Sequence, residues 1–310
     1  MTAELLAGFS DARLAALVAA AEPLGMGIGG RSAVADVSGT RVFVKRVPLT
    51  ELELRHFRST ANLFGLPLYY QYGIGSAGFG AWRELAAHLL TTGWVQAGRY
   101  DGFPLLHHWR VLPDTPPAGF LDEFGGIDGA VARWDGSPAV RARLEAIGRA
   151  SASLVLFLEY LPRTLADDVI PEVATELERG CDFMASQRFL HLDAHFRNIL
   201  TDGERLCFAD FGLALSASFD LTPAESEFLA NHLTYDRHYT ANHLLRFHVL
   251  ADEADPDQFL LAWVAGDRPP VAPEVARLLD RHAAGAVTLH DFHQRLLENK
   301  STPYPSGELG

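Results

Sequence analysis

Cysteine is scarce in this sequence of 310 residues, and long apolar runs are missing from it. Its two cysteines, Cys181 and Cys207, are too few for a disulfide framework, and neither has the spacing of a metal ligand. No apolar run reaches the roughly 18 residues that a membrane-spanning helix needs. The first 23 residues lack the basic start of a secretory signal. These absences favour a cytoplasmic location without a membrane partner.

Basic residues are also fewer than acidic ones. Lysine and arginine total 26 against 39 aspartates and glutamates, which gives a formal net charge of −13. Because a protein needs a basic face to bind a phosphate backbone, this balance argues against a nucleic-acid partner. The apolar share of 48% and the charged share of 21% are ordinary for a globular protein, and the chain is long enough to form two moderate lobes.

Lysine is the rarest charged residue, because arginine supplies all but two of the 26 basic side chains. Lys45 lies in the apolar segment RVFVKRV, residues 41–47, which indicates a site that needs a compact ammonium rather than a planar guanidinium. Lys300 precedes a polar tail, residues 301–310, that is predicted to be disordered, and its position suggests no such role.

The first half of the chain is predicted to contain several strands and one principal helix. Residues 34–47 have a hairpin pattern around a Ser-Gly-Thr turn, and Pro48 is expected to end the second strand. Helical periodicity covers residues 81–96, and the apolar runs at 103–112 and 153–161 are typical of strands.

The second half is predicted to be mainly helical. Helices are expected over residues 171–187 and from about 223 to 297, with short strand-like pieces at 198–201 and 205–209 between them. A strand-rich front half and a helical back half predict an α+β fold with a cleft between its two parts.

The segment FLHLDAHFRNILTDGERLCFADFGLAL, residues 189–215, carries the strongest chemical signal. Asp193 and Asn198 are five positions apart, and Asp210 follows after a predicted turn. Phosphoryl transfer requires positioning, neutralised charge and a group that accepts the hydroxyl proton. One carboxylate can act as that base, while a second carboxylate and an amide oxygen suit a magnesium ion that bridges phosphates.

The motifs HLDAHFRNIL and FADFGLA resemble the catalytic loop and the metal-binding motif of the protein-kinase-like superfamily, which includes bacterial protein kinases and aminoglycoside and choline phosphotransferases. The resemblance implies ATP and Mg²⁺ as cofactors, Asp193 as the catalytic base, and Asn198 and Asp210 as magnesium ligands. His191 would brace the loop. His195 stands where eukaryotic-type protein kinases usually have lysine and where the small-molecule phosphotransferases commonly have histidine.

The same resemblance implies a lysine that neutralises the phosphates and a glutamate that pairs with it. Lys45 is the candidate lysine, and Glu84 in the predicted helix is the candidate glutamate. Glu51 and Glu53 follow the strand too closely to be expected on a packed helix. With Glu84 as the partner, residues 48–79 are an insertion.

The resemblance also implies a bilobal fold. An N-lobe of residues 1–161 would hold an antiparallel sheet and one main helix, and residues 162–300 would form a mostly helical C-lobe with the catalytic and metal-binding loops. A hinge at 158–161 would hold adenine through the backbone of Glu159 and Leu161.

A glycine loop that covers the nucleotide is expected before the lysine hairpin, where glycine lets the backbone approach phosphate. Two registers fit the family pattern. The first consists of Gly25, Gly27 and Gly30, and the second of Gly27, Gly29 and Ser32, followed by Val34. We favour the second because Val34 is then the apolar residue that covers the nucleotide.

Two other functions are compatible with parts of the sequence. The run from Gly73 to Gly78 spells G-x-G-x-x-G before a helix, which alone would indicate a dinucleotide-dependent oxidoreductase. No acidic residue ends a clear strand about twenty positions later, as that fingerprint requires. A pseudokinase that binds nucleotide without catalysis is disfavoured, since every expected catalytic side chain has a candidate.

The sequence narrows the class of molecule that could accept the phosphate but does not identify the compound. Nine residues, 213–221, separate the Asp-Phe-Gly motif from Thr222, which leaves little platform for a peptide. We therefore favour a small-molecule or dedicated hydroxyl-bearing substrate over serine/threonine protein phosphorylation. Residues 235–237 could line the acceptor side, although a structural role is favoured. The histidines at 232, 238, 243 and 248 recur every five or six residues, a period that makes no metal-binding face on a helix.

Overall fold

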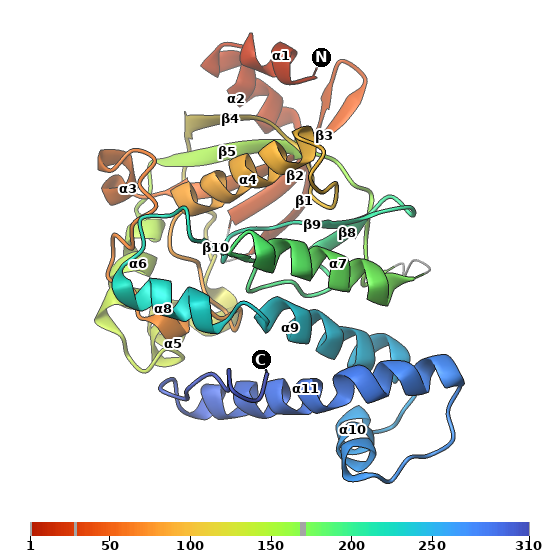
Figure 1. Ribbon diagram of the computed structural model, residues 1–310. Helices are drawn as coiled ribbons and strands as arrows, with labels where there is room; N and C mark the ends of the chain where they lie inside the picture. The colour runs from red at the N-terminus through yellow and green to blue at the C-terminus, as the bar shows by residue number, and fades with distance from the viewer. Residues whose placement is uncertain (1, 28–29, 168–171, 310) are drawn as a thin grey trace.

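The computed structural model describes residues 2–27, 30–167 and 172–309. Within these residues, eleven α-helices and a five-stranded antiparallel sheet form an α+β fold (Figure 1), which confirms the fold class predicted from the sequence. Most of the sheet lies above the long helices α7, α9 and α11 in this view. None of the described helices combines the length and the apolar character needed to cross a membrane.

The five strands pair in the order β1-β2-β3-β5-β4, so β3 and β5 lie at the centre. The predicted hairpin is confirmed, with its turn between β2 and β3. The strands are β1 (Glu22–Gly27), β2 (Gly30–Val37), β3 (Thr40–Leu49), β4 (Leu106–Pro113) and β5 (Ala152–Glu159).

The prediction that Pro48 ends its strand is wrong. Pro48 pairs with Ser153 of β5, and β3 continues to Leu49. The β2 strand reaches only as far as the pair Arg31–Arg46, so β3 has a single neighbour at this position. A proline is tolerated there because its missing N–H breaks no ladder on the open side.

Alternation along β3 gives the sheet two different faces. Val44 points to the face that α1 (Thr2–Ala7) and α2 (Asp11–Ala20) cover. Lys45 points to the opposite face, against which α4 (Ala81–Gln96) packs. The lysine is thereby directed from the sheet toward the rest of the molecule.

The remaining elements are short strands and helices outside this sheet. The helices are α3 (Glu51–Arg55), α5 (Gly126–Ala132), α6 (Pro138–Gly148), α7 (Val173–Ser186), α8 (Pro223–Asn231), α9 (Tyr235–Leu244), α10 (Pro256–Ala265) and α11 (Pro273–Glu298), with 3₁₀ turns at Leu68–Gln71 and Asp122–Phe124 and a π-helical turn at Leu245–Val249. The short strands are β6 (Arg163–Thr164), β7 (Phe189–Leu190), β8 (Ile199–Thr201), β9 (Leu206–Phe208) and β10 (Leu215–Ser216).

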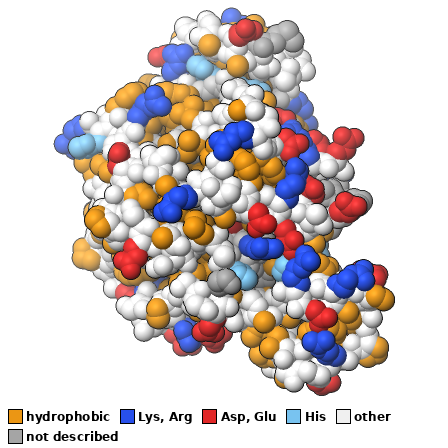
Figure 2. All heavy atoms as spheres, viewed as in Figure 1, with side chains coloured by type: hydrophobic (Ala, Val, Ile, Leu, Met, Phe, Trp, Pro, Cys, Tyr) orange, Lys and Arg blue, Asp and Glu red, His pale blue; other side chains and the backbone are white. Residues whose placement is uncertain are grey.

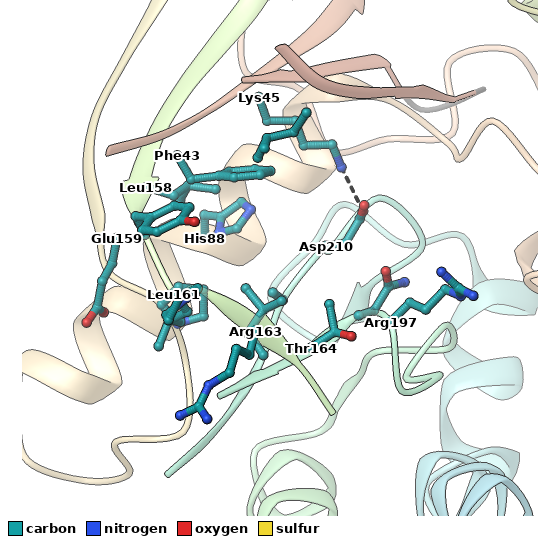
Figure 3. Close-up of a pocket in the computed structure, with 17 residues that line it drawn as sticks. Phe43, Lys45, His88, Leu158, Glu159, Leu161, Arg163, Thr164, Arg197 and Asp210 are labelled. Atoms are coloured by element: carbon teal, nitrogen blue, oxygen red, sulfur yellow. Dashed lines mark hydrogen bonds and ion pairs between the residues drawn. The ribbon is translucent and has the colours of Figure 1, made fainter. Parts of the chain in front are cut away.

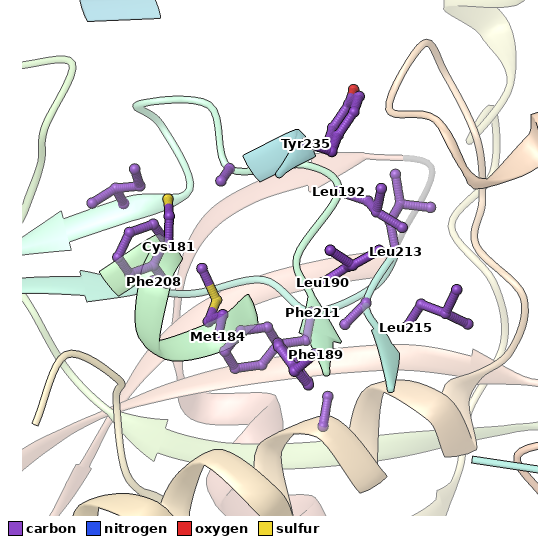
Figure 4. Close-up of a cluster of buried hydrophobic side chains, with 14 of the residues drawn as sticks. Cys181, Met184, Phe189, Leu190, Leu192, Phe208, Phe211, Leu213, Leu215 and Tyr235 are labelled. Carbon is purple, nitrogen blue, oxygen red and sulfur yellow. The ribbon is translucent and has the colours of Figure 1, made fainter. Parts of the chain in front are cut away.

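The largest hydrophobic core surrounds the segment 189–215 (Figure 4). Phe189, Phe208 and Phe211 are fully buried, and Met184 of α7 packs into the same cluster. Aromatic rings lock their neighbours through specific edge and face contacts, and the rings of Phe189 and Phe211 meet edge-on at 5.6 Å. The polar residues of this segment are therefore mounted on a rigid core.

Two segments outside the sheet form a small core of their own. One runs from α3 to α4, and the other joins β4 to β5 and contains α5 and α6. Tyr70 from the first segment meets Trp134 from the second edge-on, with ring centroids 4.7 Å apart. Phe79 and Leu144 complete the same buried cluster. Neither the contact nor its partners could be predicted from the local pattern.

The tail after Lys300 was predicted to be disordered, and this prediction is wrong for its described residues. Leu309 is 1% exposed, and its carbonyl accepts a hydrogen bond of 2.8 Å from Nε2 of His238. Tyr304 stacks on His232 with ring centroids 4.0 Å apart. Although the tail is polar in composition, its side chains Tyr304 and Leu309 pack on the helices.

Candidate active site

Three elements bring a lysine and two acids together. Strand β3 supplies Lys45, helix α4 supplies Glu84, and the turn after β9 supplies Asp210. The ammonium nitrogen Nζ lies 2.7 Å from Oε1 of Glu84. It also lies 2.7 Å from Oδ1 of Asp210, the contact drawn as a dashed line in Figure 3. Lys45 is 8% exposed and Glu84 is 2% exposed, so the pair is shielded from water.

The charges of this cluster stabilise one another. Burial disfavours the ammonium of Lys45, but Asp210 and Glu84 outweigh it and raise the lysine pKa above its ordinary value. The partial burial of Asp210 also disfavours its charge, yet the lysine and the N–H of Gly212 lower the pKa of that carboxyl to about 2. Asp210 has a φ of 62°, in the left-handed region that non-glycine residues seldom adopt. Both groups are charged at neutral pH.

Glu53 lies on a packed helix, contrary to the prediction, but it does not contact the lysine. The helix α3 begins with a capping box in which Thr50 and Glu53 bond each other's backbone. Oε2 of Glu53 lies 2.8 Å from Nη1 of Arg143, and Oε1 accepts a hydrogen bond of 2.8 Å from the N–H of Ala81. Glu53 therefore fixes the start of α4. Glu51, on the same helix, is exposed.

Asp193 and Asn198 lie in the loop between β7 and β8. Nδ2 of Asn198 donates to the backbone oxygen of Asp193 at 3.0 Å and to its Oδ2 at 3.2 Å. Oδ1 of Asp193 is buried without a hydrogen-bond partner among the described residues. Burial, together with the charge of Asp210, raises the pKa of Asp193 well above its ordinary value. Nε2 of His195 lies 3.9 Å from Oδ2 of Asp193.

His191 connects this loop to the segment that precedes Asp210. The ring is fully buried; Nδ1 accepts from the N–H of Asp193 at 3.3 Å, and Nε2 donates to the carbonyl of Ala209 at 2.8 Å. Burial lowers the pKa of His191 to about 4, so the neutral ring has one donor and one acceptor, as these contacts require.

Asp236 of α9 binds the backbone of the same loop, a role that the sequence did not reveal. Its carboxylate accepts from the N–H of His191 at 2.7 Å and from the N–H of Leu192 at 2.8 Å. Leu192 has a φ of 64°, so these bonds support a strained backbone. A lone acid in a helix gives no local signal for contacts more than forty positions away. Of the two roles weighed for residues 235–237, Asp236 has the structural one.

A cavity of about 280 Å³ lies between the sheet and the segment that follows β5 (Figure 3). Lys45, Asn198 and Asp210 line its polar end. The predicted hinge residues Glu159 and Leu161 also line it, and the side chain of Glu159 is held by Arg205. The apolar walls come from Leu24, Phe43, Leu158, Tyr160 and Leu200.

The glycine-loop residues are placed only in part. Gly29 lies outside the described residues, and Gly27 ends β1 at the tip of the β1–β2 hairpin. Ser32 and Val34 lie on β2 and do not line the cavity, whereas Leu24 on β1 does. Among the described side chains of this hairpin, Leu24 rather than Val34 lines the cavity.

The second glycine run is packed directly on the candidate catalytic residues. A Cβ at Gly73 would overlap Oδ1 of Asp193, and a Cβ at Gly78, where φ is +69°, would overlap the carbonyl of Gly212. A 3₁₀ turn precedes the run, in place of the parallel strand that a dinucleotide fingerprint requires. Close approach of two backbones explains these glycines.

The donor set at the polar end fits a magnesium–triphosphate. The carboxylate of Asp210 is 44% exposed and lines the cavity together with the amide of Asn198. Among the described residues, no three His, Cys, Asp or Glu side chains gather as a metal site. Two hard oxygen donors completed by phosphate oxygens are the usual protein environment of Mg²⁺.

Comparison with known proteins assigns no family to this chain. No protein-family model matches the sequence, and a search of curated proteins gave no significant match. The contacts described above are therefore the basis of the functional proposal.

Proposed function

We propose that this chain is an ATP- and Mg²⁺-dependent phosphotransferase with a protein-kinase-like bilobal arrangement, acting on a hydroxyl group. The observation that carries the proposal is the convergence of Lys45, Glu84 and Asp210 at the polar end of an apolar cavity, beside Asp193. In this proposal the sheet with α4 is the N-lobe and the helices after residue 161 belong to the C-lobe. We also propose a cytoplasmic location, where the two free, buried cysteines stay reduced.

The cavity divides the nucleotide between two environments. Its apolar walls, with Leu24 and Phe43 on the sheet side, would enclose the adenine, and the backbone of Glu159 and Leu161 would hold its edge. The ammonium of Lys45 would neutralise phosphate charge. Asn198 and Asp210 would hold Mg²⁺, which neutralises charge that builds up on the transferring phosphoryl group.

Asp193 is placed to accept the proton of the attacking hydroxyl. Its raised pKa makes it a stronger base than an ordinary aspartate, and its Oδ1 has no hydrogen-bond partner in the described part of the chain. Asn198 holds the other carboxylate oxygen, while His191 and Asp236 fix the backbone on which Asp193 stands. Each of these groups acts on position rather than on bond formation.

The segment after the Asp-Phe-Gly motif supports a small-molecule or dedicated acceptor. The carbonyl of Leu213 accepts a hydrogen bond from Gln71, and Leu215 pairs with Leu190 in a two-stranded sheet. The N–H of Asp220 donates to Thr60 at 2.8 Å. A short segment fixed at three places leaves little room for a docked peptide.

Replacing Asp193 with asparagine tests the proposal. The amide keeps the size of the carboxylate but cannot accept the proton, so we expect ATP turnover to fall at least about a hundredfold. ATP affinity, measured by titration calorimetry, should change less than about threefold, since Asp193 does not hold the nucleotide. Turnover retained in the Asp193→Asn variant would refute the base assignment. Efficient phosphorylation of a generic protein substrate by the wild type would favour the protein-kinase alternative.

A further inference from the structure

A second cavity of about 440 Å³ lies on the helical side of the catalytic loop. It is formed where the loop meets α9 and the π-helical turn Leu245–Val249. The proposed nucleotide site does not use this space, although Arg197 lines both cavities. The side chains that define its chemistry are His195, Phe196, Arg197, Tyr239, His243 and Phe247.

This cavity adjoins the candidate base. His195 lines it and also lines the space that contains Asp193 and Asp210. The ring of His195 is 3.9 Å from the carboxylate of Asp193. Tyr239 is close enough that, after burial, the charge of Asp193 contributes to raising its pKa. A molecule held here could therefore present a hydroxyl to Asp193.

The walls are flat rings that carry little charge. The ring of Phe196 lies 5.9 Å from that of His243 at an interplanar angle of 30°, and His243 lies 5.1 Å from Phe247. Burial lowers the pKa of His243 to about 4, so that ring is neutral at pH 7. These rings already contact one another, so a planar guest would stack against the wall that they form together.

The charge of the lining differs from that of the whole chain. Arg197 is its only permanently charged side chain, and no carboxylate lines the cavity among the described residues. A molecule with a net charge of −13 would by itself favour cationic ligands. The local charge favours neutral or anionic ones instead.

Phe247 has features of a ligand-contacting residue rather than a core residue. It is 61% exposed, although large apolar side chains are usually buried. It lies in a π-helical turn, a geometry that is frequent at functional sites because it displaces side chains from the regular helical pattern.

We propose that this second cavity is the acceptor site and that the acceptor is a hydroxyl-bearing compound with a flat, neutral or anionic ring. The inference rests on the proposed phosphotransferase function and adds the substrate class. It disfavours a polycationic acceptor, which would meet Arg197 and, among the described residues that line this cavity, no carboxylate.

Three probes with one ring test the substrate class. They are 4-(hydroxymethyl)benzoate, benzyl alcohol and 4-(aminomethyl)benzyl alcohol, which carry the same hydroxyl on an anionic, a neutral and a cationic molecule. Binding is measured by ligand-observed NMR in the presence of Mg²⁺ and a non-hydrolysable ATP analogue. We expect the anionic probe to bind at least about fivefold more tightly than the cationic one, and Arg197→Gln to remove that preference.

Two substitutions locate the binding. Phe247→Ala should weaken the anionic and neutral probes by about fivefold, the loss expected for one stacked ring. Leu261 of α10 is an apolar side chain that is 46% exposed. Leu261→Ala should leave probe binding unchanged. Equal affinity in the wild type and the Phe247→Ala variant, no binding of any probe, or a preference for the cationic probe would overturn the inference.

The two levels of the proposal fail in different ways. If the wild type binds ATP only with Mg²⁺ present but the probes do not respond to Phe247→Ala, the acceptor assignment alone is wrong. If ATP does not bind at all, the phosphotransferase proposal fails, and the acceptor assignment fails with it.

Discussion

Single residues in this site are held in states that they would not adopt in water. Asp193 keeps one carboxylate oxygen buried and, as far as the described residues go, without a hydrogen-bond partner, and Asp210 has a left-handed backbone. Such features cost free energy and persist only where the surrounding structure enforces them. Their concentration within one segment of the chain is the pattern expected of a functional site.

The pH dependence of stability tests the role of Asp236. Burial raises its pKa to about 6, above the ordinary value of about 3.9. The folded state therefore holds a proton that the unfolded state has released between these values, and stability contributed by this group falls as the pH rises from about 4 to 6. We subtract the free energy of unfolding of Asp236→Asn from that of the wild type. We expect this difference to fall by about 2 kcal/mol over this range.

Urea unfolding of both proteins at several pH values measures this difference. The comparison cancels the contributions of the buried histidines, which both proteins share. A difference that stays constant, or that grows with pH, would show that the buried carboxyl is ionised throughout.

The two lysines show how far a residue count can be interpreted. The scarcity of lysine singled out Lys45, which lies between two acids in the structure. The same count passed over Lys300, which is 4% exposed and donates to the carbonyls of Leu296 and Leu297 at the end of α11. Lys45 was recognisable because its neighbours in the sequence are apolar. Lys300 was not, because its neighbours in the sequence, Asn299 and Ser301, are polar.

At the scale of elements, the run from Gly73 to Gly80 shapes the candidate site because its backbone packs directly against it. The backbone there touches Asp193 and Gly212, and the residues up to Gly80 form a wall of the space that contains Asp193. Arg133 holds the run through the carbonyl of Ile74 at 2.7 Å. The segment is therefore part of the wall of the candidate active site.

Gly78→Ala tests that wall, with Gly98→Ala as its matched control. Both glycines have a similar φ, +69° and +65°, so both substitutions carry a backbone cost of about 1 kcal/mol. Of the two, only Gly78 faces a backbone atom, the carbonyl of Gly212, while no atom of the described residues lies within 4 Å of a Cβ at Gly98. We expect ATP turnover to fall at least about tenfold in Gly78→Ala and to stay near the wild-type rate in Gly98→Ala. Equal turnover in the two variants would contradict this.

Local patterns predicted the elements whose signals are local. The hairpin, α4 and β5 all appear near their expected positions, because local apolar periodicity and turn residues decide them. The short helix at Glu51, the continuation through Pro48 and the order in the tail were missed. The last two depend on distant partners, Ser153 of β5 and the helices beneath Leu309. The short helix has a local signal that was overlooked, the capping box of Thr50 and Glu53.

On the scale of the whole molecule, buried ion pairs connect parts that are distant in the sequence. Arg83 of α4 lies 2.6 Å from Glu225 of α8, and both side chains are at most 2% exposed. This contact connects the helix that carries Glu84 to the helical half. On the face drawn in Figure 2, by contrast, acidic and basic side chains are mixed, as on an ordinary solvated surface.

Breaking this pair should destabilise the protein strongly. Arg83→Ala leaves Glu225 buried and unpaired, and we expect a loss of about 3 to 5 kcal/mol in the free energy of unfolding. Arg83→Met combined with Glu225→Leu should recover most of that loss, because no uncompensated charge remains. Urea unfolding measures both. A loss below about 1 kcal/mol in Arg83→Ala would mean that the pair does not connect the two halves.

The central claim is that Lys45, Asn198 and Asp210 form a site for a magnesium–triphosphate. Calorimetric titration of ATP with and without Mg²⁺ tests it directly, in the wild type, in Asp210→Ala and in Asp252→Ala, an exposed acid in the loop before α10. We predict that Mg²⁺ tightens ATP binding at least about tenfold in the wild type and in Asp252→Ala, and not in Asp210→Ala. The same magnesium effect in all three proteins, or no ATP binding by the wild type, would contradict the claim.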